Sequence, residues 1–193
     1  GCARATAPRR TAPLPLAPRI MLLTIMLVAF AARAHHLAFD SLWSDEGISL
    51  LRAAEPLREM LAAMPVEHTP GYFVALHAWM ALTGASDYAV RFFSLIGSVL
   101  AVALLQRLGS DLARPTAVHR WIGMVGAALL ATNATQVAYA QEARMYAWLV
   151  AMGLLATVAL WNMLNPPRSA WRYSAPAWGV VYALAVAACV YLH

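Results

Sequence analysis

The sequence predicts an all-α integral membrane protein. Hydrophobic residues make up 62% of the 193 positions and charged residues only 12%, which is about half the charged share of an average soluble domain. Lipid offers no water to backbone groups, so chains cross a membrane as helices or closed barrels. Apolar residues here form long continuous runs rather than the short alternating segments of barrel strands. We therefore expect a polytopic helical bundle with about five transmembrane helices.

The basic residues bear on membrane topology. All 14 of them are arginines, and the formal net charge is +5. Arginines in loops between apolar runs mark the cytoplasmic side of a membrane protein, so this charge does not predict a nucleic-acid partner. The two cysteines, Cys2 and Cys189, lie far apart in unrelated contexts. We expect no disulfide framework from them.

The N-terminal region begins with a polar segment. Residues 1–19 are rich in Arg, Pro and Ala, which predicts a disordered cytoplasmic tail. The first apolar run covers 20–38 and is expected to be the first span. Its basic flank and Ala32-Arg33-Ala34 also fit a cleavable signal peptide, which remains an alternative. If the basic flank stays inside, the loop over 39–86 emerges on the outer side.

The first half of this loop has the pattern of short surface helices. Apolar side chains at helical spacing form one stripe: Leu50, Ala54, Leu57, Leu61 and Met64. Pro56 interrupts the stripe, because proline has no N–H to donate inside a helix. We expect two short helices over 46–64, the second starting at Pro56, and both lying in the membrane interface.

The apolar run over 70–84 decides the topology. Its 15 residues would make a helix about 22 Å long, whereas a span needs about 20 apolar residues. If it crossed the membrane, both arginine-bearing loops that follow, around 107–120 and 168–172, would lie outside, against the positive-inside rule. We therefore expect an interfacial or re-entrant helix. The remaining spans are then expected near 87–108, 121–140, 143–163 and 174–193.

Two adjacent carboxylates, Asp45 and Glu46, follow the first span. The chain has only nine Asp and Glu, and an ionisable residue near membrane depth is by default a functional-site hypothesis. The alternative is that both acids occupy the first turn of a helix, where negative charge suits the helix dipole.

Two further polar clusters are expected on the same outer side. One is Glu67-His68 in the loop, and the other is the run QEARMY at 141–146, between the third and fourth spans. Each has an ordinary explanation: a loop or capping role for His68, an ion pair between Glu142 and Arg144, or snorkelling of Arg144 to the interface. Their coincidence on one face of the membrane favours a site.

These motifs, taken in order, resemble those of a known enzyme family. They are LWSDEGISLL at 42–51, PLREML at 56–61, EHTPGYFVALHAWMALTG at 67–84, AVRFFSLIGSVLAVALL at 89–105 and QEARMYAWL at 141–149. The set is similar to the GT-C glycosyltransferases that use lipid-phosphate sugars, the branch related to protein O-mannosyltransferases and aminoarabinose transferases. The resemblance identifies 20–193 as the N-terminal part of a GT-C transmembrane domain. We expect such a fragment to be inactive alone.

The resemblance also implies roles for single residues. Asp45 and Glu46 match the family's acidic pair, whose first acid is the catalytic base. The family's HPPLYY element corresponds to 68–73, its RLPS element to 91–94, and its QEARMY element is present intact. The arginine of that last element, Arg144, resembles the one near the donor phosphate. The residues assigned to donor or substrate binding are Gln141, Glu142, Arg144, Tyr146, Arg91 and Tyr72.

The chemistry of these residue types fits the same function. A carboxylate such as Asp45 can accept the proton of an acceptor hydroxyl, and a guanidinium such as Arg144 can stabilise the charge on a leaving phosphate. The predicted activity is inverting transfer of a sugar from a polyprenyl-phosphate donor to a protein, lipid or glycan acceptor. It would take place on the extracytoplasmic side of the inner or plasma membrane. A divalent cation held by Glu67, His68 and one acid of the pair is left open.

Two other classes of protein remain open. A carrier or flippase of lipid-linked sugars would also place charges near the interface, but carriers tend to have paired discontinuous helices at the midplane and internal repeats. The polar clusters here lie at span ends, and no repeat is visible. The chain could also be a purely structural part of a larger assembly.

Overall fold

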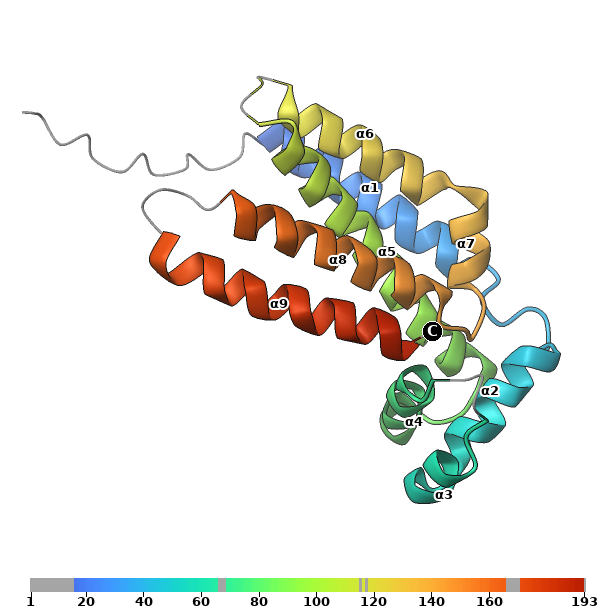
Figure 1. The fold of residues 1–193 in the computed structure, drawn as a ribbon. Helices are drawn as coiled ribbons and strands as arrows, with labels where there is room; N and C mark the ends of the chain where they lie inside the picture. The colour runs from blue at the N-terminus through green and yellow to red at the C-terminus, as the bar shows by residue number, and fades with distance from the viewer. Residues whose placement is uncertain (1–15, 66–68, 115, 117, 166–170, 193) are drawn as a thin grey trace, which may run out of the picture.

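The described part of the chain is entirely helical. The computed structural model describes residues 16–65, 69–114, 116, 118–165 and 171–192, without side chains for 171–174. Within these residues the chain forms nine helices, α1 to α9, and no strand. Figure 1 shows the longer helices side by side in one bundle, with the shorter ones gathered at one end of it.

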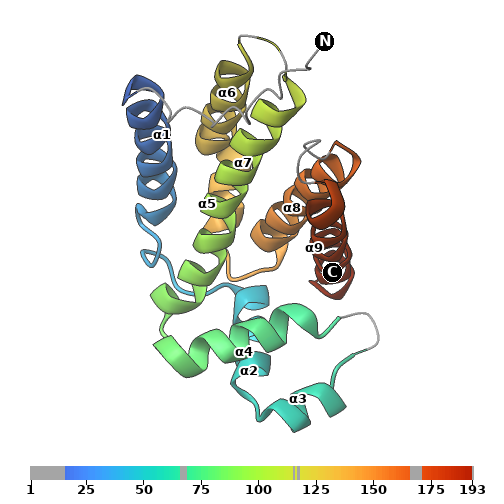
Figure 2. The ribbon, with the colours of Figure 1, turned by 90° about the vertical axis from the view of Figure 1, so that its left-hand side faces the viewer.

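Four helices are long and apolar enough to cross a membrane. They are α1 (Leu16–Ala34), α5 (Asp87–Leu112), α8 (Tyr146–Leu164) and α9 (Trp171–Leu192), the last through its segment Ala175–Leu192. Neighbouring helices run in opposite directions, α6 beside α5 and α9 beside α8 (Figures 1 and 2). The helical membrane bundle that the composition predicts is therefore the architecture observed. α1 begins at Leu16, inside the segment expected to be a disordered tail; residues 1–15 lie outside the described part.

The helix expected over 121–140 is divided in two, and neither part is among the four helices long enough to cross alone. That this segment is a fifth span stays a prediction. α6 (His119–Thr132) ends before Asn133, and α7 (Ala134–Ala140) begins after it. Asn133 has an extended backbone, and its side chain accepts a 3.0 Å hydrogen bond from the backbone N–H of Gln136. Asparagine is among the best residues at this N-cap position. It starts a new helix here rather than continuing the old one.

The break is stabilised by an arginine from another helix. The last carbonyls of a helix have no partner within it, and Arg33 of α1 donates to two of them, Leu130 at 3.0 Å and Ala131 at 2.8 Å. Arg33 is fully buried and also donates to the Ser98 hydroxyl of α5 at 2.7 Å. This guanidinium therefore joins α1, α5 and α6 at the point where α6 stops.

Three short helices form the segment between α1 and α5. They are α2 (Ser44–Ala54), α3 (Leu57–Ala62) and α4 (Gly71–Thr83). Pro56 stands between α2 and α3 and precedes the first residue of α3, so the predicted division at this proline is observed. α4 has 13 residues, about 20 Å of helix, and lies across the end of the bundle where α5 begins (Figure 2). That α2 to α4 lie in the membrane interface stays a prediction.

A small apolar core attaches these helices to the bundle. Its buried members come from α2, α3, α4, α5 and the turn before α8: Ala53, Met60, Tyr72, Phe73, Leu76, Val90 and Ala143. The indole N–H of Trp79 in α4 donates to the Ala89 carbonyl in α5 at 2.8 Å. Helices α2 to α4 are thus packed against the bundle, next to the turn between α7 and α8.

The proposed topology can be tested by labelling cysteines at the two ends of α5. Ala85→Cys precedes this helix and Thr116→Cys follows it, both at exposed positions; the native Cys2 and Cys189 would be replaced by serine. We expect a membrane-impermeant maleimide to label Ala85→Cys in intact cells and Thr116→Cys only after permeabilisation. Labelling of both from the same side would contradict the topology.

Candidate functional site

The centre of the candidate site is a buried ion pair between Glu46 and Arg91. The side chain of Glu46 is 0% exposed and that of Arg91 7%. Arg91 Nε donates to Glu46 Oε1 at 2.9 Å, and Arg91 Nη2 donates to Glu46 Oε2 at 2.7 Å. This is the bidentate geometry in which a guanidinium binds a carboxylate most strongly. The pair joins the first turn of α2 to the first turns of α5.

Arg91 uses all of its hydrogen-bond donors within the protein. A guanidinium has five N–H groups. Two bind Glu46, and three bind backbone carbonyls between α1 and α2: Leu37 at 3.2 Å, Asp40 at 2.7 Å and Ser41 at 3.2 Å. No donor remains for a substrate phosphate. The structure therefore places Arg91, which the sequence assigned to substrate binding, in a structural network.

The Glu46 carboxylate is equally well satisfied. It accepts hydrogen bonds from the backbone N–H of Ala143, at 2.7 Å, and of Trp43, at 3.3 Å. Burial alone would raise the pKa of Glu46, but the hydrogen bonds from Arg91, Ala143 and Trp43 outweigh it and leave the pKa below its ordinary value. Glu46 is therefore an anionic anchor, held away from solvent and from any acceptor.

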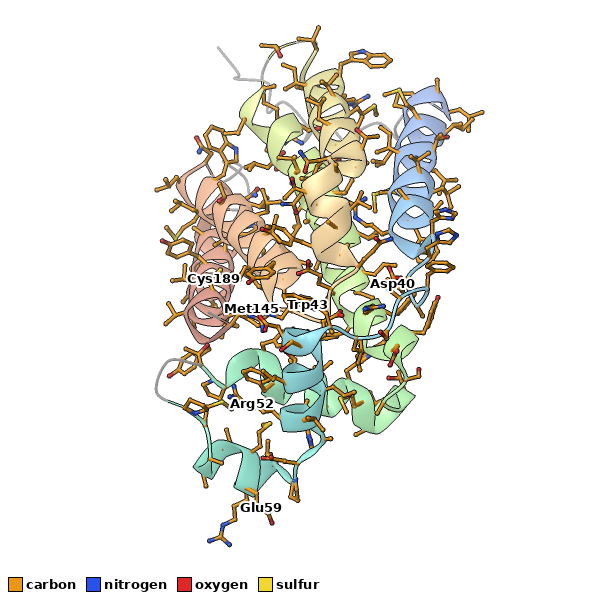
Figure 3. The ribbon with its side chains drawn as sticks, turned by 90° about the vertical axis from the view of Figure 1, so that its right-hand side faces the viewer. Asp40, Trp43, Arg52, Glu59, Met145 and Cys189 are labelled. Carbon is orange, nitrogen blue, oxygen red and sulfur yellow. The ribbon has the colours of Figure 1, made fainter. Side chains whose placement is uncertain are left out.

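Asp45 has quite different surroundings from its neighbour. Its side chain is 42% exposed, and its Oδ2 lies 3.4 Å from Nη1 of Arg144. Trp43 lies two residues before Asp45, and Met145 directly follows Arg144. Their labels in Figure 3 show where α2 meets the bundle. Two of the three clusters expected on one face of the membrane are thus in contact, and of the adjacent acids only Asp45 is open to solvent.

Arg144 makes fewer hydrogen bonds than Arg33 and Arg91, the arginines already described at this end of the bundle. Its side chain is 15% exposed, and its Nε is buried without a hydrogen-bond partner among the described residues. Its guanidinium carbon lies 5.8 Å from the centre of the Tyr146 ring. The main chain is fixed, because the Ser94 hydroxyl donates to the Arg144 carbonyl at 3.1 Å. Arg144 is therefore held in place but keeps unused donors.

Gln141 and Glu142, the first two residues of the QEARMY run, have different surroundings. Gln141 donates through Nε2 to the carbonyls of Arg33, at 3.2 Å, and His35, at 2.8 Å, so it attaches the α7–α8 turn to the end of α1. Arg144 pairs with Asp45 rather than with Glu142. Burial raises the pKa of the Glu142 carboxyl, and the nearby Glu46 adds to the rise.

Tyr72 lies beneath this cluster. The residue is 2% exposed, and its hydroxyl has no hydrogen-bond partner within the described part of the chain. Burial raises the pKa of the phenol well above its ordinary value, while the nearby Ser94 hydroxyl and the positive charge of Arg144 oppose the rise. A buried donor without a partner costs stability, which makes Tyr72 a candidate to contact a bound ligand.

An apolar cavity of about 360 Å³ adjoins the cluster. Its volume is at the lower end of the range for small-molecule sites. Phe93, which precedes Ser94, and Trp148, two residues after Tyr146, line it together with Tyr191 of α9. Gly71 lies on its wall, where a Cβ would collide with the Tyr191 carbonyl. Helix α4 can therefore approach α9 only because residue 71 is glycine.

The predicted metal ligands cannot be placed. Glu67 and His68 lie outside the described residues. Among the residues that are described, no group of three or more His, Cys, Asp or Glu side chains is arranged to hold an ion.

Sequence reasoning missed two residues that shape the site. Arg33 was noted only in a possible cleavage motif, although a charge inside the first span is itself an unusual signal. Ser94 was noted only as the last residue of the 91–94 element, because its contact with the Arg144 carbonyl depends on how α5 packs against the start of α8.

Comparisons with known proteins identified no relative. No protein-family model, no curated protein sequence and no solved structure matches the chain.

The two adjacent acids should differ sharply in their effect on stability. Glu46→Gln breaks a buried ion pair and leaves Arg91 as an uncompensated charge, so we expect a loss of about 3–5 kcal/mol. Asp45→Asn removes a half-exposed contact and should cost less than about 1 kcal/mol. Thermal unfolding of the purified protein in detergent measures both. Similar small losses for the two variants would contradict the structural role of Glu46.

Proposed function

We propose that this chain belongs to a membrane glycosyltransferase that moves a sugar from a polyprenyl-phosphate donor to an extracytoplasmic acceptor: a protein, a lipid or a glycan. The observation that carries the proposal is the contact between Asp45 and Arg144, an exposed carboxylate beside an under-used guanidinium. This transfer needs one group to remove a proton and another to bind a phosphate. The motifs resemble the lipid-phosphate-dependent GT-C transferases in the same residues.

In the proposed reaction Arg144 binds the phosphate and Asp45 acts as the base. Charge-assisted hydrogen bonds from Arg144 to the phosphate oxygens stabilise the charge that develops as the sugar leaves. Asp45 accepts the proton of the acceptor hydroxyl, whose oxygen attacks the anomeric carbon. The bond from that carbon to the phosphate oxygen breaks, and its electron pair stays on the phosphate. Attack opposite the leaving phosphate inverts the anomeric centre.

The surrounding residues support these two. The Glu46–Arg91 pair positions Asp45, because Glu46 follows it directly and is fixed to α5. Tyr72 and Tyr146 are the side chains available to contact the phosphate or sugar, and Glu142 and Gln141 shape the turn that presents Arg144. The apolar cavity beside Phe93 and Trp148 suits the isoprenoid carbons next to the phosphate.

The proposed location is the inner or plasma membrane of the cell, crossed several times. Arg107 and Arg114 lie at the opposite end of α5 from Asp45 and Arg144, with half or more of each side chain exposed. Arginines gather on the cytoplasmic side, which supports an extracytoplasmic site.

One observation favours a carrier or flippase as the second candidate. The division between α6 and α7 at Asn133 is a discontinuous helix, a feature that transporters use at their substrate sites. Here, however, Arg33 already binds the carbonyls freed by the break. A carrier would move lipid-linked sugar between leaflets without forming a new glycosidic bond, and reconstituted vesicles distinguish the two activities.

The proposal is tested by replacing the base. In the protein expressed from its complete gene, Asp45→Asn should reduce sugar transfer by about 10²–10⁴-fold, the usual contribution of a positioned general base. Asparagine keeps the size of the side chain but cannot take the proton. Transfer from a radiolabelled polyprenyl-phosphate sugar in isolated membranes is the measurement, with the exposed Glu59→Gln on α3 as the charge-matched control. Near-normal turnover in Asp45→Asn would end the catalytic-base proposal.

Arg144→Lys should give a different defect in the same assay. Lysine keeps the charge but loses the planar fork that binds two phosphate oxygens. We expect a higher KM for the lipid donor together with a lower kcat, because the contact acts both in binding and in the transition state. A variant with unchanged donor kinetics would remove Arg144 from the proposed site.

A further inference from the structure

The two groups with opposite roles in the proposed reaction are in contact with each other. Asp45 Oδ2 lies 3.4 Å from Arg144 Nη1. In this ion pair the Asp45 carboxylate faces the guanidinium rather than an acceptor hydroxyl. The same contact takes up part of the charge with which Arg144 would bind a phosphate. With this ion pair formed, neither residue is free for its proposed task.

The contact is one that a phosphate can displace. Its atoms lie 3.4 Å apart, whereas the bidentate pair of Glu46 with Arg91 has hydrogen bonds of 2.7 and 2.9 Å. The Arg144 Nε stays buried without a partner in the part of the chain that the structure describes, so the guanidinium is not saturated there. The 19-residue helix α8 begins two residues further on, and no side chain caps its first turn. A phosphate between Arg144 and this helix end would meet both the guanidinium and the positive end of the helix dipole.

Asp45 can leave the contact without any movement of the backbone. Its carbonyl accepts a 2.9 Å hydrogen bond from the Ser49 hydroxyl, and the next residue, Glu46, is fixed by Arg91. The Asp45 side chain is 42% exposed, so rotation about its own bonds is sufficient to turn it toward solvent. Only a side chain has to move for the base to be released.

We propose that the phosphate of the lipid donor displaces Asp45 from Arg144, so that the donor binds first and thereby releases the base for the acceptor. This inference rests on the proposed function and adds an order of binding to it. The phosphate oxygens take over the N–H groups of Arg144, and the freed Asp45 carboxylate then accepts the acceptor's hydroxyl proton. Without a donor the ion pair re-forms, and the site does not activate an acceptor or water.

Binding of a polyprenyl phosphate without sugar tests the displacement, because no turnover is involved. The protein from the complete gene is placed in nanodiscs of zwitterionic lipid, and binding of radiolabelled polyprenyl phosphate is measured at equilibrium. Asp45→Asn should bind about two- to five-fold more tightly than the unaltered protein, since removing a half-exposed ion pair removes a competitor of about that strength. Arg144→Gln should lose most of the binding.

Asp40→Asn is the matched control. It removes one negative charge from the same end of the bundle, at an exposed side chain that lies apart from Met145 in Figure 3. We expect its affinity to change by less than that of Asp45→Asn. An equal gain in both variants would reduce the effect to net charge and overturn the displacement. Thermal unfolding of each variant confirms that it is folded.

The outcomes separate this inference from the proposed function. If Arg144→Gln abolishes binding but Asp45→Asn binds no more tightly than the unaltered protein, the displacement is wrong and the phosphate role of Arg144 stands. If Arg144→Gln binds normally, Arg144 does not hold the phosphate, and both proposals fail together.

Discussion

The buried ion pair between Glu46 and Arg91 is the interaction on which the site depends. It brings together four segments: the linker after α1, the first turn of α2, the beginning of α5 and the turn before α8. Two charges removed from water are costly unless each is fully bonded, and here every donor of Arg91 and both oxygens of Glu46 have partners. The neighbouring Asp45 is placed against Arg144 as a consequence, because the residue that follows it cannot move.

Three arginines at this end of the bundle show how hydrogen-bond saturation separates structure from function. Arg33 bonds the carbonyls at the end of α6, and Arg91 bonds Glu46 and the linker after α1, so both hold helices together. Arg144 has a fixed main chain and a buried Nε that no other described residue bonds. A guanidinium that is positioned but not satisfied is suited to an anionic ligand. By the same reasoning Asp45, exposed and weakly paired, is suited to proton transfer and Glu46 is not.

Much of this arrangement could be predicted from sequence patterns that act locally. Pro56 divides the loop helices because it lacks an N–H, and the length of the 70–84 run excluded a span. Counting the expected membrane spans placed Asp45 and Arg144 on the same side of the membrane. What could not be predicted depends on contacts between distant segments. Arg33 binds the carbonyls freed where α6 ends before Asn133, and Arg91 and the Ala143 N–H both bond Glu46 but not the adjacent Asp45.

The anomeric configuration of the reaction product tests the central claim most directly. A base beside the acceptor and a guanidinium on the leaving phosphate describe a single displacement at the anomeric carbon, without a bond between sugar and protein. NMR coupling constants give the configuration of the sugar in the donor and in the product made by the protein from its complete gene. Direct displacement predicts inversion. Retention of configuration, or movement of the lipid-linked sugar without any new glycosidic bond, would contradict the roles given to Asp45 and Arg144.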